Sequence, residues 1–299
     1  MKQETKCLHS GYVPKNGEPR QMPIYQSTTF KYDSSDAMGR LFDLEDSGYF
    51  YTRLQNPSND MTAAKIADLE GGVAAMLTSS GQAANFFALF NICETGSHIV
   101  ASSAIYGGTY NLLGVTMKKW VLMLLLSIRI FPKKSLQRHS DQTQGQCSVK
   151  QLPIRPCLFL ILKSLQDLLT RTVFRLLLTT LLQPLSIVSR LSGVLTLLLT
   201  QTTKYMDGHG VSVGGAIVDS GNFDWEAHAD KFPGLTQPDE SYHGLTYTKA
   251  FGKMAYMTKA TAQLMRDLGS IQSPQNSFLL NLGLETLHLR VPRHCENAQ

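Results

Sequence analysis

A lysine in a turn rich in threonine and glycine is the residue best suited to covalent chemistry. Lys204 lies in the segment TTKYMDGHG, residues 202–210, directly after Thr203. A lysine amine can form a Schiff base with a carbonyl compound, and neighbouring hydroxyl groups can hold a phosphate. The segment therefore predicts a Schiff-base lysine with a phosphate nearby, and a solvated surface lysine is the alternative.

The segment SSGQ, residues 79–82, is a candidate anion site. It lies between an apolar run that predicts a short buried strand, residues 73–78, and a run that predicts a helix, residues 85–92. Backbone N–H groups at the start of a helix bind anions, and glycine lets the backbone approach closely. Gly81 and Gln82 are therefore predicted to hold a phosphate, and a plain turn is the alternative.

Three further residues have side chains that suit a flat ligand with a phosphate. Tyr106 opens the segment YGGT and could lay its ring against a flat cofactor. Tyr51 and Arg53, in the segment YTRLQNPSND, offer a hydroxyl group and a two-pronged phosphate donor. Taken singly, a packed core tyrosine and a surface pair are the alternatives.

The elements around these residues alternate between strand and helix. An amphipathic run begins at Met61 and stops at Gly71, and strands are predicted at 73–78 and 98–101 with a helix between them. This order favours an α/β fold with a mainly parallel sheet. The later part of the chain predicts a strand, a long polar and aromatic loop and two helices, at 213–218, 223–247, 262–268 and 278–289.

The segment 120–201 differs from the rest of the chain in composition. Its 82 residues hold 23 leucines, ten basic and two acidic residues, and no alanine, asparagine, tyrosine or glutamate. The other residues carry 18 basic and 21 acidic side chains, so the net charge of +5 comes from this segment and does not indicate a nucleic-acid partner. Its uncharged stretches, 176–189 and 191–203, are shorter than the roughly 20 residues of a membrane span, so membrane association is the weaker interpretation.

The five cysteines are scattered, without the close pairs of a metal site or a redox motif. They predict reduced thiols. The polar start of the chain lacks the apolar stretch of a signal peptide. Both observations favour a cytoplasmic protein without a bound metal.

Taken together and in this order, the motifs resemble the γ-family of fold-type I, pyridoxal 5'-phosphate (PLP) dependent enzymes of Cys/Met metabolism. The shared pattern is Tyr-x-Arg with Asn-Pro, Ser-Ser-Gly-x-x-Ala, Tyr-Gly-Gly-Thr and Thr-Lys-Tyr-x-x-Gly-His. Within that family, residues 51–60 and the loop 232–245 are similar to O-acetylhomoserine sulfhydrylases. The resemblance covers about residues 1–119 and 202–299.

The resemblance implies a PLP-dependent transferase-like fold of type I, an α/β fold with a mainly parallel sheet flanked by helices. Residues 1–60 would form an N-terminal arm, and residues 61–290 the large PLP-binding domain. Residues 291–299 would begin a C-terminal domain that is truncated, together with the arginine that grips the substrate carboxylate.

The resemblance also implies a role for each candidate residue of the site. Lys204 would form the Schiff base with PLP and move protons. Tyr106 would stack on the pyridine ring and could assist the leaving group. Gly81 and Gln82 would hold the phosphate through their backbone N–H groups, and Thr203 would hold it through its hydroxyl group.

Tyr51 and Arg53 match phosphate ligands that a neighbouring subunit supplies in this family. The resemblance therefore implies a homodimer at minimum, and usually a tetramer built as a dimer of dimers.

Two positions depart from the family pattern. Gln201 stands where the family has a serine, three residues before the lysine. The family also places an aspartate on an upstream strand, where its carboxylate keeps the pyridine nitrogen protonated. No acidic residue lies between Asp167 and Lys204.

A reading-frame slip accounts for both departures. Codons chosen to encode residues 175–184, read from the third base, also encode LIVDNTFAT, a buried strand that ends in the missing aspartate. In the same frame, codons for residues 194–201 encode ADIVTHS, which restores the serine. We hypothesise that two compensating slips, near Lys119 and near Gln201, replaced the native segment.

The resemblance implies that the chain converts O-acetyl-L-homoserine and sulfide into L-homocysteine and acetate, in methionine and cysteine biosynthesis. The alternatives are the reaction of another family member, of the cystathionine γ-synthase or methionine γ-lyase type, and an inactive, frame-shifted and truncated fragment. The expected partners are PLP, a small amino-acid substrate, sulfide and further copies of the chain. Neither nucleic acid nor a membrane is expected.

Overall fold

A seven-stranded sheet organises the computed structural model, which describes residues 1–95, 97–102, 106–120, 123–127, 145–150, 176–180 and 195–297. Much of the leucine-rich segment 120–201, including Cys157, lies outside these residues. The described strands are β1 (Ala74–Thr78), β2 (His98–Ser102), β3 (Met123–Ser127), β4 (Gly145–Lys150), β5 (Leu176–Thr180), β6 (Leu195–Thr200) and β7 (Gly215–Asp219).

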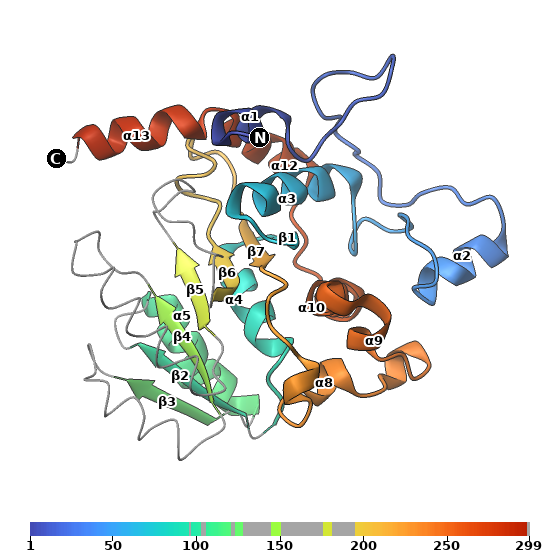
Figure 1. The fold of residues 1–299 in the computed structure, drawn as a ribbon, viewed down its shortest axis with the longest axis vertical. Helices are drawn as coiled ribbons and strands as arrows, with labels where there is room; N and C mark the ends of the chain where they lie inside the picture. The colour runs from blue at the N-terminus through green and yellow to red at the C-terminus, as the bar shows by residue number, and fades with distance from the viewer. Residues whose placement is uncertain are drawn as a thin grey trace.

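The strands follow the order β1-β7-β6-β5-β4-β2-β3 across the sheet (Figure 1). The pairs β2–β3, β2–β4, β4–β5 and β5–β6 are parallel. Strand β7 runs antiparallel to both of its neighbours, β1 and β6. The prediction of a mainly parallel sheet is confirmed, and the strand predicted at 213–218 is β7.

Helices cover the sheet on both faces (Figure 1). Four described α-helices belong to the N-terminal part of the fold: α1 (Gln3–His9), α2 (Ser35–Phe42), α3 (Pro57–Glu70) and α4 (Gly81–Phe90), of which α3 and α4 contact β1. The short elements α5 (Gly107–Asn111), η1 (Leu112–Thr116) and η2 (Met117–Trp120) follow β2. The elements after β7 are η3 (Glu226–His228), α8 (Pro233–Thr236), η4 (Glu240–Tyr242), α9 (Tyr247–Phe251), η5 (Gly252–Met254), α10 (Ala255–Lys259), η6 (Ala260–Met265), α11 (Arg266–Leu268), α12 (Pro274–Glu285) and α13 (Leu287–Asn297).

Strands β6 and β7 are buried on both faces of the sheet, and this explains the apolar run at the centre of each. On β6, the side chains of Leu197 and Leu199 belong to one hydrophobic cluster and that of Leu198 to the other. The first cluster includes residues of α4 and α10, such as Phe87 and Tyr256, and the second is built with α1, α3, α12 and α13. Because alternate side chains of a strand point to opposite faces, a run of leucines fits a strand covered on both sides.

Local signals set the ends of the helix α3. Asn56 caps it by accepting a hydrogen bond from the backbone N–H of Ser58, at 2.9 Å, and Pro57 occupies its first turn. Gly71 ends it in the left-handed region, at φ 77°. The helix predicted from Met61 therefore begins four residues earlier, at the proline that the apolar spacing alone does not reveal.

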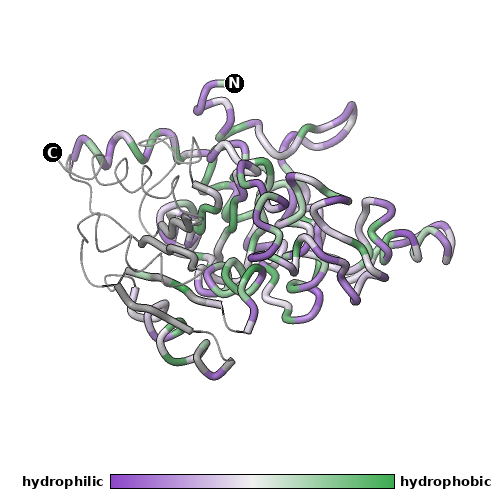
Figure 2. Tube along the Cα trace, turned by 60° about the horizontal axis from the view of Figure 1, so that its bottom comes forward, coloured by the Kyte–Doolittle hydropathy of each residue, from purple (hydrophilic) through white to green (hydrophobic). Residues whose placement is uncertain are grey.

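The first 60 residues contain α1 and α2, joined by long stretches without regular structure. Figure 1 shows α2 at the edge of the molecule, away from the sheet, whereas α1 lies beside α3 and α12. Figure 2 shows a largely hydrophilic trace in this region and more hydrophobic stretches around the sheet. Among the described residues, no helix has the length and apolar character needed to cross a membrane.

Candidate active site

The start of helix α4 has the geometry of an anion cradle. The hydroxyl group of Ser80 caps the helix by accepting a hydrogen bond from the backbone N–H of Ala83, at 3.1 Å. The first N–H groups of a helix have no partner within it, and they carry the positive end of the helix dipole. Gly81 and Gln82 supply two of these groups. The helix predicted from residue 85 begins at Gly81 because Ser80 caps it there.

Gly81 packs against the chain just before the candidate lysine. A β-carbon built on Gly81 would lie 2.8 Å from both Cβ and Cγ of Gln201, which is three residues before Lys204. A β-carbon on Gly215, at the start of β7, would lie 2.4 Å from the carbonyl oxygen of Ser80. The structure therefore brings the start of α4 and the segment that leads to Lys204 into contact.

Lys204 lies in a turn that follows β6. The backbone N–H of Asp207 donates to the carbonyl oxygen of Thr202 at 3.1 Å, and that of Gly208 donates to the carbonyl oxygen of Lys204 at 3.0 Å. The Lys204 side chain is exposed. Ligands of open α/β sheets bind beyond the carboxyl ends of the parallel strands, and Lys204 lies beyond that end of β6.

Thr203 lies in the same turn, with its hydroxyl group bonded to the chain. This group accepts a hydrogen bond from the backbone N–H of Gly214 at 2.9 Å, and it donates to the carbonyl oxygen of Gly214 at 3.1 Å. These bonds tie the lysine turn to the residue before β7. A phosphate bound by Thr203 would have to share or replace them, so that role stays a prediction.

Tyr106 stands at the start of α5, which is tied to α4 through Gln82. The side-chain amide of Gln82 donates to the carbonyl oxygen of Gly108 at 3.3 Å, and its oxygen accepts from the hydroxyl group of Thr109 at 3.2 Å. The side-chain amide of Asn85 donates to the side-chain oxygens of Gln82 and Thr109. The Tyr106 ring is 57% exposed, so it is not the packed core tyrosine of the alternative interpretation.

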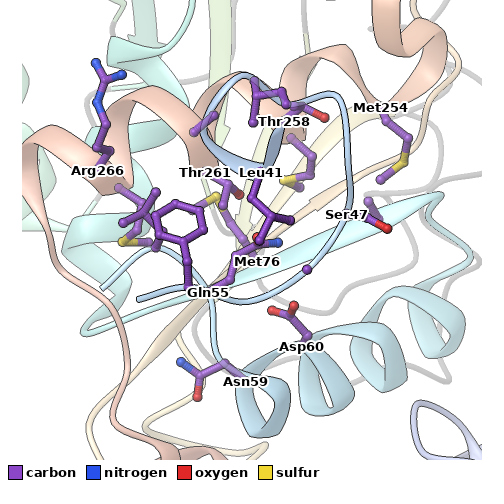
Figure 3. Close-up of a pocket in the computed structure, with 18 of the residues that line it drawn as sticks. Leu41, Ser47, Gln55, Asn59, Asp60, Met76, Met254, Thr258, Thr261 and Arg266 are labelled. Carbon is purple, nitrogen blue, oxygen red and sulfur yellow. The ribbon is translucent and has the colours of Figure 1, made fainter. Parts of the chain in front are cut away.

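Tyr51 and Arg53 lie elsewhere in the chain. The guanidinium carbon of Arg53 is 5.3 Å from the centre of the Tyr51 ring. Both residues line a cavity of about 1140 Å³ that also touches α3, β1 and η6 (Figure 3). The described lining of this cavity does not include Lys204 or the start of α4. Within one chain, the structure does not bring this pair to the lysine.

Asp60 is a titratable residue of this cavity that the sequence did not single out. It projects from the first turns of α3 in Figure 3. Burial raises the pKa of its carboxyl group to about 6, although a hydrogen bond with Tyr49 opposes the shift. Asp60 ends the segment YTRLQNPSND, but nothing in that segment indicates that its side chain is half-buried.

The residues present fit the phosphate end of PLP better than its ring nitrogen. The anion cradle at Gly81 adjoins the chain before Lys204, as a cofactor joined to the lysine and held by its phosphate requires. Strand β5 pairs with β6 in parallel, with Thr179 opposite Leu199 and Thr180 opposite Thr200. The five positions of β5 hold only leucine and threonine, so this strand supplies no carboxylate for a ring nitrogen.

A known family model matches most of the chain. The family model described as Cys/Met metabolism PLP-dependent enzyme matches residues 4–143 and 180–299. The match extends further into the segment 120–201 than the motifs alone predicted, and it leaves out residues 144–179.

Similar proteins are known from several organisms. The chain is 37% identical to an O-acetyl-L-homoserine sulfhydrylase of Leptospira meyeri over 100% of its own length and 69% of that protein. It is 35% identical to O-acetyl-L-homoserine sulfhydrylase 1 of Thermus thermophilus over 100% of its length and 71% of that protein.

Solved structures share the fold. A crystal structure from Campylobacter jejuni, assigned as an O-acetylhomoserine (thiol)-lyase with a pyridoxyl-lysine phosphate, gives a TM-score of 0.90 at 27% identity and covers 100% of this chain and 74% of that one. A cystathionine gamma synthase of Xanthomonas oryzae gives 0.75 at 23% identity, over 100% of this chain and 66% of that one, and so supports the fold alone. The fold is that of the type I PLP enzymes, and the chain belongs to the family of Cys/Met metabolism PLP-dependent enzymes.

Proposed function

We propose that this chain catalyses the replacement of acetate by sulfide at the γ-carbon of O-acetyl-L-homoserine, which yields L-homocysteine and acetate. The observation that carries the proposal is the contact between Gly81, in the cradle of α4, and Gln201, three residues before Lys204. The names of the relatives from Leptospira meyeri and Thermus thermophilus support this substrate.

Each residue of the site has a task in this reaction. When bound, PLP supplies an electrophilic carbonyl group and an acceptor for electrons released at the α-carbon. The first N–H groups of α4, at Gly81 and Gln82, hold the phosphate. Lys204 anchors the cofactor and then acts as the base that removes the proton from the α-carbon of the substrate.

Two further residues act on the ring and on the leaving group. The exposed ring of Tyr106, whose turn is tied to α4, would lie against the flat face of the cofactor. Its hydroxyl group can donate a proton toward the departing acetate. The carbon–oxygen bond at the γ-carbon breaks and a carbon–sulfur bond replaces it, so no oxidant or reductant is required.

We also infer that the site is completed by a second copy of the chain. Tyr51 and Arg53 line a cavity that does not include Lys204, but their hydroxyl and guanidinium groups suit a phosphate. In a homodimer they would reach the cradle of the partner, and a dimer of dimers would repeat that arrangement. The free thiols of Cys7 and Cys295 suit a reducing, cytoplasmic location.

The test is the formation of homocysteine from O-acetyl-L-homoserine, sulfide and added PLP by the purified chain. Lys204→Ala should abolish it. Lys249→Ala is the matched control, since Lys249 is an exposed lysine of α9 and lies outside the site. Equal activity in wild type and Lys204→Ala would contradict the proposal.

A second candidate is an inert chain that retains the fold. The observation that favours it is the sequence of β5, which offers no carboxylate beside the cofactor ring. A wild-type chain that binds PLP at Lys204 but forms no homocysteine would favour this candidate. Homocysteine formation that depends on Lys204 would exclude it.

A further inference from the structure

We propose that Arg290 is a positioning residue for Lys204, and that it locks the lysine turn onto helices α12 and α13. The inference rests on the proposed function of Lys204. Arg290 does not reach the reacting atoms in this account. It acts through the backbone that carries the lysine.

The guanidinium group of Arg290 binds the two carbonyl groups that follow Lys204 directly. Its Nη1 donates to the carbonyl oxygen of Tyr205 at 2.7 Å, and its Nη2 donates to that of Met206 at 3.2 Å. Nη2 also donates to the carbonyl oxygen of Gly283 in α12, at 2.6 Å. One planar cation therefore joins the lysine turn to a neighbouring helix, with the fixed fork geometry that only arginine offers.

The third nitrogen of the Arg290 guanidinium group fixes the orientation of the fork. Its Nε donates to the hydroxyl group of Thr286 at 3.0 Å, one turn earlier in the chain. Because Thr286 lies between α12 and α13, directly before the helix that carries Arg290, the guanidinium group reaches the lysine turn from a set position. A fork held in this way loses less conformational freedom per hydrogen bond than a free side chain.

Two glycines let the turn and the arginine approach closely. Gly208 has φ +73°, and a β-carbon built on it would lie 2.7 Å from the guanidinium carbon of Arg290. A β-carbon on Gly283 would lie 2.2 Å from the carbonyl oxygen of Asp207 and 2.5 Å from that of Met206. The backbone of the lysine turn thus packs directly on α12, without side chains between them.

Helix α13 makes a second contact with the turn through Tyr205, the residue next to Lys204. The Tyr205 hydroxyl group donates to the carbonyl oxygen of Arg290 at 3.1 Å and also contacts Nδ1 of His294. The guanidinium carbon of Arg290 lies 5.4 Å from the centre of the Tyr205 ring. The turn is therefore held through the carbonyl groups of Tyr205 and Met206 and through the Tyr205 side chain. The Lys204 side chain stays exposed for chemistry.

The test compares Arg290→Met and Arg290→Lys with a control on the same helix, Arg293→Met. Arg293 is 72% exposed and forms an ion pair with Glu296 at 3.1 Å, so its loss leaves the turn untouched. The first measurement is amide hydrogen exchange without PLP. We expect Asp207 and Gly208, whose N–H groups are bonded within the turn, to exchange about tenfold faster or more in Arg290→Met.

The second measurement is the PLP concentration that half-saturates the visible absorbance of the lysine-bound cofactor. Arg290→Met should need about tenfold more PLP or more, Arg290→Lys should fall between, and Arg293→Met should match wild type. Exchange in α3, at Ile66, checks the fold, because a loss of overall stability would speed that amide too.

The outcomes separate the inference from the proposed function. If wild type binds no PLP, the proposed function fails, and the exchange data still decide the role of Arg290. If the amides of Asp207 and Gly208 exchange equally fast in Arg290→Met and Arg293→Met, the lock does not exist. If their exchange is faster in Arg290→Met but its PLP binding equals that of wild type, Arg290 does not position Lys204. If Arg290→Met fails to fold, Arg290→Lys decides: faster exchange in the turn with Ile66 still protected supports the lock, and wild-type exchange overturns it.

Discussion

The two sides of the lysine site differ in what their residues supply. On the α4 side, Ser80 caps a helix and Gly81 lies against the chain that leads to Lys204, so the helix start that we propose as the anion cradle adjoins that chain. On the β5 side, residues 176–180 form a strand in parallel register with β6, but they include no acidic residue. A buried strand asks only for apolar side chains, whereas a cradle or a carboxylate needs one residue at one place. The fold therefore tolerates a change of sequence that the chemistry does not.

Strand β6 shows how far this tolerance goes. It lies within the leucine-rich segment 120–201, and yet Leu197, Leu198 and Leu199 fill both hydrophobic cores of the molecule. Leucine-rich sequence in another reading frame can satisfy such a strand because packing depends on volume and polarity more than on identity. The frame slip stays a hypothesis, and the family match at residues 180–201 does not test it.

The largest expected effect comes from mixing two inactive variants. Lys204→Ala lacks the lysine, and Arg53→Met lacks the phosphate ligand proposed to act in the partner's site. In a random mixture, hybrid dimers would contain one intact site, so activity should return to about a quarter of the wild-type level per site. The measurement is homocysteine formation by each variant alone and by the refolded mixture. No recovery in the mixture, with both variants folded, would mean that Arg53 serves its own chain.

The next effect tests the β5 side directly. A gene resynthesised with residues 120–201 in the shifted frame should restore an aspartate at the end of β5. An ionised acid beside a cationic ring nitrogen favours the protonated ring by about one to three pKa units, so activity should rise by roughly a hundredfold. The control is the same resynthesised gene with asparagine in place of that aspartate. Equal activity of the two encoded proteins would show that the carboxylate does not contribute to the reaction.

The α4 side can be weakened by a single methyl group. Gly81→Ala would place its β-carbon 2.8 Å from Gln201, and overpacking of this kind costs about 1–3 kcal/mol. We expect a lower midpoint in urea and weaker PLP binding. Gly107→Ala is the matched control, since a β-carbon there meets nothing within 4 Å. Equal losses in the two variants would show that the close contact at Gly81 is not what matters.

The smallest effect concerns Asp60, in the cavity of Tyr51 and Arg53, away from both sides of the lysine site. Burial raises the pKa of its folded-state carboxyl group to about 6, above its unfolded value of 3.8, so the folded state binds the proton more tightly. This contribution to stability is present at low pH and is lost as pH rises through about 6. The free energy of unfolding should therefore rise by about 1 kcal/mol from pH 7 to pH 5. Asp60→Asn should lack that part of the pH dependence, and an unchanged slope in urea denaturation would contradict the assignment.

The sequence could predict those parts of the fold and site that depend on local patterns. Short-range signals indicate the strand before Gly81, the mainly parallel sheet and the glycine-containing turn at residues 202–210, and the structure contains each of them. The strand β6 was not predicted, because the leucine clusters of the segment 120–201 show no clean period and few turn residues that would mark the ends of a strand.

Other features depend on contacts between distant parts of the chain. The packing of Gly81 on Gln201, the partial burial of Asp60 and the hydrogen bonds of Arg290 to the lysine turn all join segments far apart in sequence. No local pattern encodes such pairs. The family motifs indicated that Gly81 and Lys204 act together. In the folded chain, Gly81 packs against Gln201, three residues before Lys204.

The most direct test of the account locates the cofactor on the chain. PLP-loaded protein would be reduced with borohydride, digested, and read by tandem mass spectrometry. The account predicts a phosphopyridoxyl group on the peptide that contains Lys204, at close to one per chain, and its absence in Lys204→Ala. A label distributed over exposed lysines such as Lys249 and Lys253, or no label at Lys204 in folded protein, would contradict it.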